Sequence, residues 1–149
     1  MNMSYIIVLW GKGNRGKTQT LNLVANLLCT SYDAILIEGL ITDDIRDDSN
    51  CVLEYRGKKI GIVTSGDNGN ILHNEFENLP TDCDLYICPT RTKESSCDFV
   101  RDSFNNIVWV EKWAITTENC NISNIDFLQR KANQIQALGI IDLINEIVL

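Results

Sequence analysis

The chain has 149 residues, of which 44% are hydrophobic and 22% are charged, and this composition is ordinary for one globular domain with a complete core. No stretch approaches the roughly 18 apolar residues that a membrane-spanning helix needs. The net charge of −7 argues against unaided binding to nucleic acid, which normally uses a basic face. We therefore expect a single domain over residues 1–149, with no membrane span and no direct contact with nucleic acid.

The cysteines and the N-terminus both indicate a cytoplasmic protein. The six cysteines form no C-x-x-C pair and no cluster with histidine. Cys29, Cys88 and Cys97 fall at apolar positions of predicted helices or strands, which predicts buried free thiols in a reducing compartment. The first four residues, M-N-M-S, lead directly into the first predicted strand, so we expect no signal peptide.

The first predicted strand is the apolar run Tyr5–Trp10. The next eight residues, G-K-G-N-R-G-K-T, match the pattern G-x-x-x-x-G-K-[ST]. A helix follows, because apolar residues recur at helical spacing at Leu21, Val24, Ala25 and Leu28. A strand, a glycine loop and a helix in this order are typical of a phosphate-binding P-loop.

Each residue type in this loop suits a phosphate for a separate reason. Glycine lets backbone N–H groups converge on phosphate oxygens without obstruction. Lys17 supplies a charge toward the β- and γ-phosphates, Thr18 supplies a hydroxyl for Mg²⁺, and the helix dipole favours an anion. We expect the nucleotide to be bound by Gly11, Lys12, Gly13, Asn14, Arg15, Gly16, Lys17, Thr18 and Gln19.

The second predicted strand, Ala34–Ile37, ends at Glu38 and leads into a polar loop with aspartates at positions 43, 44, 47 and 48. This acidic loop is either a solvated, mobile loop or a switch-like or substrate-facing segment. The next two runs, Cys51–Tyr55 and Lys59–Thr64, predict a hairpin because the turn between them contains Gly57.

Asn68 opens a short predicted helix that carries His73, the single histidine, which we expect at the surface rather than as a catalytic base. A core strand over residues 84–89 follows. A helix capped by Ser95 or Ser96 then carries Phe99, Val100 and Phe104.

The last predicted strand covers Ile107–Ile115. The final helix starts near Ser123, its apolar spacing is set by Ile125, Leu128, Ala132 and Ile135, and Gly139 is expected to interrupt it. The apolar tail beyond Gly139 docks on the sheet or meets a partner, and we favour docking. Strands that alternate with helices predict an α/β fold of three layers, a P-loop NTPase fold with a mostly parallel central sheet and helices on both faces.

A P-loop needs an acidic residue at the end of a core strand to hold Mg²⁺ with Thr18. Asp67 and Glu38 both follow apolar strands, and ligands in such sheets lie beyond the carboxyl ends of the strands. We favour Asp67, and both can contribute. Arg91, just past another strand, is either a surface residue or a ligand of the γ-phosphate or of a substrate anion. No N-K-x-D guanine signature is present, which favours ATP.

The residues Gly11–Thr18 resemble the deviant Walker A motif, G-K-G-G-x-G-K-T, of partition and cell-division-site ATPases. The stretch D-L-Y-I-C-P-T is also similar to that family's strand that ends in proline. Lys12 falls on the family's signature lysine. The resemblance therefore implies a nucleotide-dependent homodimer, in which Lys12 reaches the nucleotide of the neighbouring subunit.

Three functions remain open from the sequence. The first is a small ATPase that binds Mg²⁺-ATP and acts as a nucleotide-gated switch for a protein partner, which the acidic loop, Lys12 and the apolar C-terminus favour. The second is a small-molecule or nucleotide kinase in which Arg91 and the weaker candidate Lys93 bind the acceptor. The third is a nucleotide-binding module that does not hydrolyse ATP. In the first two, Lys17, Asp67 and Arg91 are the expected catalytic residues.

Overall fold

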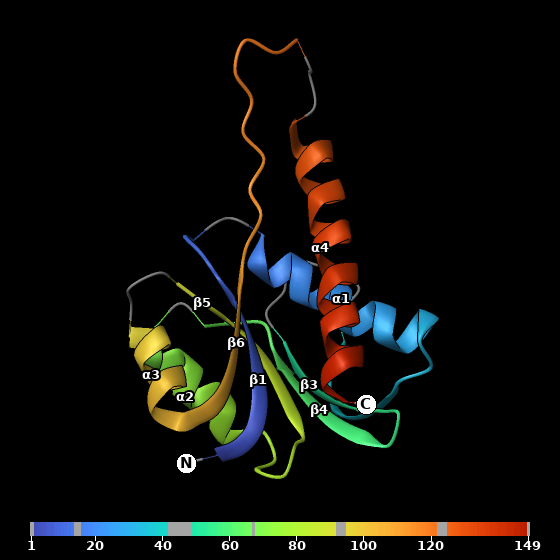
Figure 1. The fold of residues 1–149 in the computed structure, drawn as a ribbon, viewed down its shortest axis with the longest axis vertical. Helices are drawn as coiled ribbons and strands as arrows, with labels where there is room; N and C mark the ends of the chain where they lie inside the picture. Colours follow the sequence, from blue (N-terminus) through green and yellow to red (C-terminus); the bar gives the residue numbers. More distant parts are fainter. Residues whose placement is uncertain are drawn as a thin grey trace.

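The computed structural model describes residues 2–13, 16–41, 49–66, 68–91, 95–121 and 125–148. Its strands are β1 (Asn2–Trp10), β2 (Ile35–Gly39), β3 (Asn50–Tyr55), β4 (Lys58–Val63), β5 (Leu85–Thr90) and β6 (Phe104–Glu111). Its helices are α1 (Lys17–Ser31), α2 (Gly69–Glu77), α3 (Ser95–Ser103) and α4 (Ile125–Ile147). The strands form one six-stranded sheet in the order β2-β3-β4-β5-β1-β6, so the chain has an α/β fold (Figure 1).

The sheet is mostly parallel, as the alternation of elements predicts. Strand β1 pairs in parallel with both β5 and β6, and β4 pairs in parallel with β5. Strand β3 runs antiparallel to its neighbours β2 and β4. The carboxyl ends of β1, β2, β4, β5 and β6 therefore lie at one edge of the sheet, where the loop after β1 begins.

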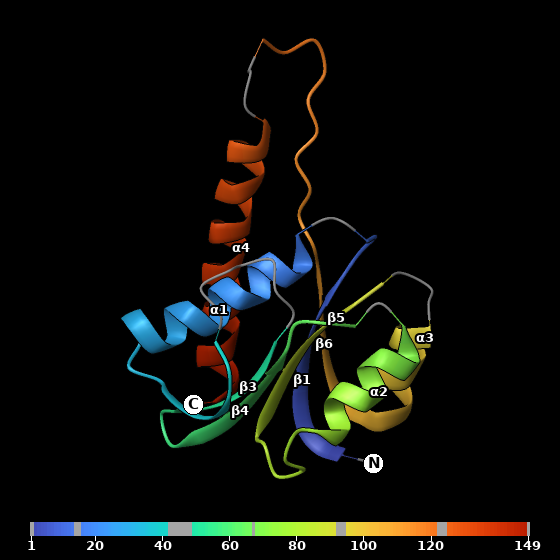
Figure 2. The same cartoon turned by 180° about the vertical axis from the view of Figure 1, so that it is seen from behind.

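The side chains of β1 alternate between two buried clusters. Ile7 and Leu9 pack with residues of α1 and α4, whereas Ile6 and Val8 pack with residues of α2 and α3. Figures 1 and 2 show the two pairs of helices on opposite sides of β1 and β5. A strand whose side chains are buried on both faces has to be apolar throughout, which explains the continuous run in β1.

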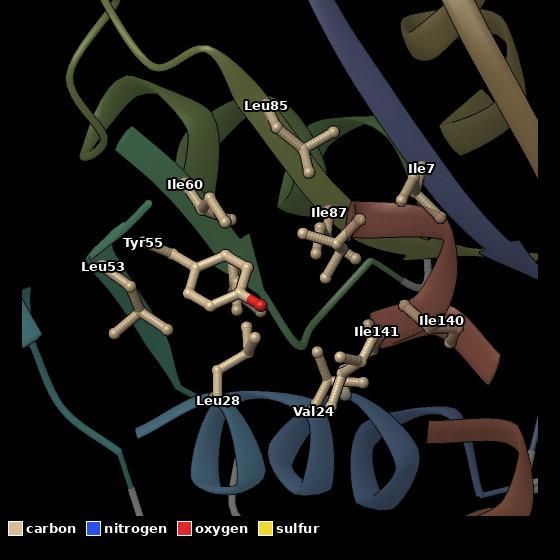
Figure 3. Close-up of a cluster of buried hydrophobic side chains, with 14 of the residues drawn as sticks. Ile7, Val24, Leu28, Leu53, Tyr55, Ile60, Leu85, Ile87, Ile140 and Ile141 are labelled. Carbon is tan, nitrogen blue, oxygen red and sulfur yellow. The ribbon is translucent and has the colours of Figure 1, made fainter. Parts of the chain in front are cut away.

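Helix α1 presents to the sheet the face that its sequence predicts. Its buried apolar residues are Leu21, Val24, Ala25 and Leu28. Figure 3 shows Val24 and Leu28 pointing from α1 toward side chains of the sheet, next to Ile140 and Ile141 of α4. Burying each such side chain contributes roughly 1.5–3 kcal/mol, so this cluster fixes α1, and with it the end of the glycine loop, against the sheet.

The hairpin of β3 and β4 forms as predicted, with Arg56 and Gly57 at positive φ in its turn. Strand β2 also forms, but as the edge strand with all five residues exposed. His73 is exposed and pairs with Glu77 through Nε2 and Oε1 at 2.8 Å, so its expected surface position is confirmed. Among the described residues, no helix is both long and apolar enough to cross a membrane.

Two boundaries near the C-terminus differ from the sequence prediction. Phe104, which we expected on the preceding helix, opens β6, and β6 ends at Glu111 instead of residue 115. Residues 112–121 contain no helix or strand and run beside α4 (Figures 1 and 2). Amides of Gln129 and Gln136 hold this segment, because they bond to the backbone of Trp113 and Ile115, and these bonds replace the strand pairing that the sequence suggests.

Helix α4 is longer and differently oriented than its apolar spacing predicts. Ile125 and Ile135 are exposed, and the residue expected to interrupt the helix, Gly139, lies inside it. The helix continues because Ile140, Ile141 and Ile144 are buried against α1 and the sheet. The apolar tail therefore docks, as we favoured, and tertiary packing outweighs the low helix propensity of glycine.

Replacing Gly139 by alanine should stabilise the protein by about 0.5–1 kcal/mol. A β-carbon at Gly139 would have nothing within 4 Å, so the change adds helix propensity without a clash. Urea unfolding of the variant and the wild type measures the difference. A loss of stability would show that the helix is interrupted at this position after all.

Candidate functional site

The glycine loop lies at the carboxyl edge of the sheet, between the end of β1 and the start of α1. Gly16 occupies the position before α1 with a φ of 83°, in the left-handed region that favours glycine. A β-carbon at Gly16 would also lie 2.9 Å from Nδ2 of Asn133 in α4. Gly16 is therefore required both by the backbone conformation and by the close approach of α4.

Lys17 is the buried cation of this loop, with only 7% of its surface exposed. Its ammonium donates hydrogen bonds to the carbonyl oxygens of Gly11 and Lys12 and, at 3.0 Å, to that of Thr90 at the end of β5. These three acceptors are backbone carbonyl oxygens and carry no net charge. The bonds hold the ammonium where β1, the loop and β5 meet.

Thr18 joins the start of α1 to the end of β4. Its hydroxyl donates to the carbonyl oxygen of Thr64 at 3.0 Å. The hydroxyl of Thr64 in turn donates to the carbonyl oxygen of Ser49 at 2.9 Å and accepts from the Ser49 N–H at 2.6 Å. The carbonyl oxygen of Thr64 therefore lies against the Thr18 hydroxyl, and oxygen ligands are those that Mg²⁺ prefers.

Arg91 lies against the loop from the end of β5. A β-carbon at Gly13 would approach its Nη2 atom to 2.8 Å and its Cζ atom to 3.0 Å. The backbone N–H of Arg91 donates to Oγ of Ser96 at 3.2 Å, which ties the residue to the start of α3. The structure thus brings the guanidinium to the loop, within reach of a phosphate group bound there.

The other predicted site residues are placed as follows. Lys12 is exposed, and Gln19 is half-buried on α1. Glu38 is exposed on β2, which is separated from β1 by three strands, or about 19 Å at the usual spacing of about 4.8 Å between strands. The structure therefore does not bring Glu38 to the loop. Asn14, Arg15 and Asp67 lie outside the described residues, as do Lys93 and the four aspartates that follow β2.

A polar cluster beside the loop is absent from the sequence prediction. Lys112, just past β6, donates to Oδ1 of Asn133 at 2.7 Å and to the carbonyl oxygen of Trp113 at 2.6 Å. The amide of Asn133 donates to Oε1 of Gln19 at 3.0 Å. Asn133 thus connects Lys112 to Gly16 and Gln19 at the start of α1. No local sequence motif indicates this cluster, because its members come together only when α4 packs on α1.

Burial shapes the electrostatics of Lys112, which is 6% exposed. It lowers the pKa of Lys112 from 10.5 to about 8, because the charged form loses water. At neutral pH the folded protein therefore keeps a costly charged amine beside the loop.

Replacing Lys112 by methionine should remove a pH-dependent part of the folding free energy. Between pH 8 and 10.5 the unfolded chain holds a proton on Lys112 that the folded chain has released, so wild-type stability rises with pH in this window. The full penalty, about 3 kcal/mol at about 1.4 kcal/mol per pKa unit, acts below pH 8. Both acceptors of Lys112 keep a donor in the variant, because the amide of Gln129 also bonds to them.

The measurement is urea unfolding of wild type and Lys112→Met across pH 7 to 10.5. As pH rises, the free energy of unfolding of the wild type should increase relative to that of Lys112→Met. The control Lys58→Met, which changes an exposed lysine, should show the same pH profile as the wild type. Taking the difference cancels the titration of the buried cysteines. Parallel profiles for the wild type and Lys112→Met would contradict the lowered pKa.

The cysteines are free in the structure, with Cys88 and Cys97 buried as expected and Cys29 partly buried. Burial raises the pKa of Cys51 to about 12 and raises that of Cys88 still further, so these thiols stay protonated. Among the described residues, no group of three or more histidine, cysteine or acidic side chains could hold a metal ion.

No family model, curated protein or solved structure matches this chain.

Proposed function

We propose that this chain is a small P-loop NTPase that binds Mg²⁺-ATP, hydrolyses it and acts as a nucleotide-gated switch or subunit for a protein partner. The observation that carries the proposal is the position of Lys17. The loop G-K-G-N-R-G-K-T follows a buried parallel strand, precedes a helix and holds the Lys17 ammonium on backbone carbonyls at the carboxyl edge of the sheet. The fold is then that of a P-loop NTPase, with three layers and helices on both faces of the sheet.

In this proposal, each residue around the loop contacts a different part of a bound triphosphate. Lys17 exchanges its carbonyl acceptors for phosphate oxygens, which carry more charge. Arg91 lies over Gly13 and binds the γ-phosphate, where a guanidinium neutralises the charge that shifts between oxygens during transfer. The N-terminus of α1 adds its partial positive charge.

The metal site of the proposal uses oxygen ligands. Thr18 already has its hydroxyl beside the carbonyl oxygen of Thr64, and oxygen ligands of this kind fit Mg²⁺ rather than a softer metal. Asp67, three residues after Thr64, is the carboxylate that we assign to the metal or its water. When bound, Mg²⁺ would neutralise phosphate charge. Glu38 is left out of this assignment because its strand lies at the far edge of the sheet.

The test is release of phosphate from Mg²⁺-ATP by the purified protein without any added acceptor. Steady release that is lost in Lys17→Ala and Asp67→Asn, but kept in Glu38→Gln, supports the ATPase. ATP binding without release, followed by transfer only when a small-molecule or nucleotide acceptor is added, would assign the kinase instead. Binding with neither reaction would assign a non-hydrolysing module.

Lys12 separates a dimeric switch from a monomeric enzyme. Its side chain is exposed, whereas that of Lys17 is buried, so Lys12 is free to contact a second copy. If it neutralises the phosphates of a neighbouring subunit, Lys12→Ala should leave ATP affinity and folding nearly unchanged, within about 0.5 kcal/mol of stability, but prevent ATP-dependent dimerisation. Light scattering with and without a non-hydrolysable ATP analogue measures this. A wild type that stays monomeric with the analogue would exclude the homodimer.

A further inference from the structure

We propose that the cavity at the carboxyl ends of β1 and β6 binds a nucleobase, a role that rests on the proposed nucleotide binding by the adjoining loop. The cavity has a volume of about 490 Å³, within the range of roughly 300–1,000 Å³ that is usual for small-molecule sites. Its lining includes Trp10, Gly11, Lys12, Glu111, Lys112 and Trp113. Two of these residues, Gly11 and Lys12, are the first two residues of the glycine loop.

The side chains around the cavity suit a flat heterocycle that carries N–H donors. Trp10 and Trp113 line the cavity, and an indole is a side chain on which any base can stack. Glu111 pairs in register with Trp10 across the two strands, so its carboxylate lies at the same level of the sheet. A carboxylate accepts hydrogen bonds from the exocyclic amine of a base.

The position of Trp113 is fixed although its side chain is half exposed. The backbone N–H of Trp113 donates to Oε1 of Gln136 at 3.0 Å. Its backbone carbonyl oxygen accepts from Nζ of Lys112 at 2.6 Å and from Nε2 of Gln129 at 3.2 Å. The indole nevertheless keeps 51% of its surface exposed. Because the backbone of Trp113 is anchored beside the cavity, binding of a ring does not first require this segment of the chain to be ordered.

Two sources supply this chemistry, and the experiment separates them. The base belongs either to the nucleotide whose phosphates the loop binds or to a separate nucleoside beside it. Both contact the same tryptophans and the same carboxylate. They differ in whether adenosine still enters the cavity once the loop is saturated with ATP.

Tryptophan fluorescence gives a direct readout, because two of the three tryptophans line the cavity and the third can be removed. Trp109 does not line the cavity, and the Cζ atom of Arg101 lies over its ring, 5.0 Å from the ring centroid. In a Trp109→Phe background, adenosine and ATP should quench the remaining emission, whereas inorganic tripolyphosphate should quench it much less. Quenching by all three ligands to the same extent would overturn the proposal.

Trp113→Ala supplies the second readout, with the ligand-free melting temperature as its folding control. The variant should bind ATP at least tenfold more weakly, while its affinity for tripolyphosphate changes less than twofold. Glu111→Gln should reduce the preference for adenosine over purine riboside, which lacks the exocyclic amine. An unchanged ATP affinity in Trp113→Ala would overturn the assignment.

Competition between adenosine and ATP shows whether the bound base belongs to ATP or to a separate nucleoside. Adenosine that quenches the ATP-saturated protein indicates a separate nucleoside, and adenosine excluded by ATP indicates the base of ATP itself. If tripolyphosphate does not raise the melting temperature, phosphate binding by the glycine loop is contradicted. Quenching by adenosine would still test whether the cavity binds a base. The failure of the proposed function and the failure of this inference are therefore distinguishable.

Discussion

Replacement of Lys17 by alanine is expected to remove most of the stabilisation that Mg²⁺-ATP gives the folded protein. A ligand that binds only the native state at about a hundredfold its Kd raises the free energy of unfolding by roughly 2.7 kcal/mol. For a chain of this size that gain corresponds to about 5–10 °C in melting temperature, at about 2–4 °C per kcal/mol. Lys17 is the buried ammonium of the loop, so its loss removes the charge that we propose to contact the phosphates.

The measurement is a thermal melt of each protein with and without nucleotide, each compared with its own ligand-free melt. Lys58→Ala is the matched control, because Lys58 is an exposed lysine on the hairpin, and it should keep the full shift. A wild-type melt that millimolar nucleotide leaves unmoved would remove the central claim about the loop.

Gly66→Ala should destabilise the protein by about 3 kcal/mol, in the upper range for overpacking of a close contact. A β-carbon at Gly66 would lie 2.3 Å from the carbonyl oxygen of Pro89 and 3.2 Å from Cδ1 of Leu72. The Pro89 oxygen belongs to β5, which is buried between β1 and β4 and cannot move alone. The chain after β4 would have to separate from β5.

The same displacement should weaken nucleotide binding. The carbonyl of Thr64, which holds Thr18, is two residues before Gly66, and the carbonyl of Thr90, which holds Lys17, is next to Pro89. Gly57→Ala is the control, since a β-carbon at Gly57 would have nothing within 4 Å, although Gly57, unlike Gly66, lies at a positive φ of 76°. It should cost only about 1 kcal/mol of backbone strain in urea unfolding. Equal losses for the two variants would contradict the steric argument.

Local patterns predicted the elements whose burial follows directly from the chain. The apolar run of β1, the helical spacing in α1 and the hairpin turn at Gly57 each needed no information from distant residues. Because the loop lies between β1 and α1, its place at the carboxyl edge followed from the same patterns. The approach of Arg91 to Gly13 could be anticipated in part, since β5 ends at the same edge.

Other features depend on contacts between residues that are far apart in the chain. The strand order places β2 at the outer edge, so Glu38, which follows a convincing apolar run, ends far from the loop. Asn133 and Lys112 have ordinary polar positions in the sequence. The packing of α4 brings Asn133 beside Gly16 and into contact with Lys112, which the pairing of β6 with β1 places beside Gly11. Periodicity alone could not reveal that the buried face of α4 includes Asn133 and Gln136.

The segment after β6 has a consequence for amide hydrogen exchange. The N–H groups of Trp113 and Ile115 donate to side-chain oxygens of Gln136 and Gln129, at 3.0 and 2.9 Å, instead of to a neighbouring strand. In heavy water these two amides should keep their protons longer than those of the exposed residues that follow them. Their exchange depends on the contact with α4, and α4 also carries Asn133, which lies against Gly16. A phosphate group that moves the glycine loop is thus detectable as deuterium uptake in a segment outside that loop.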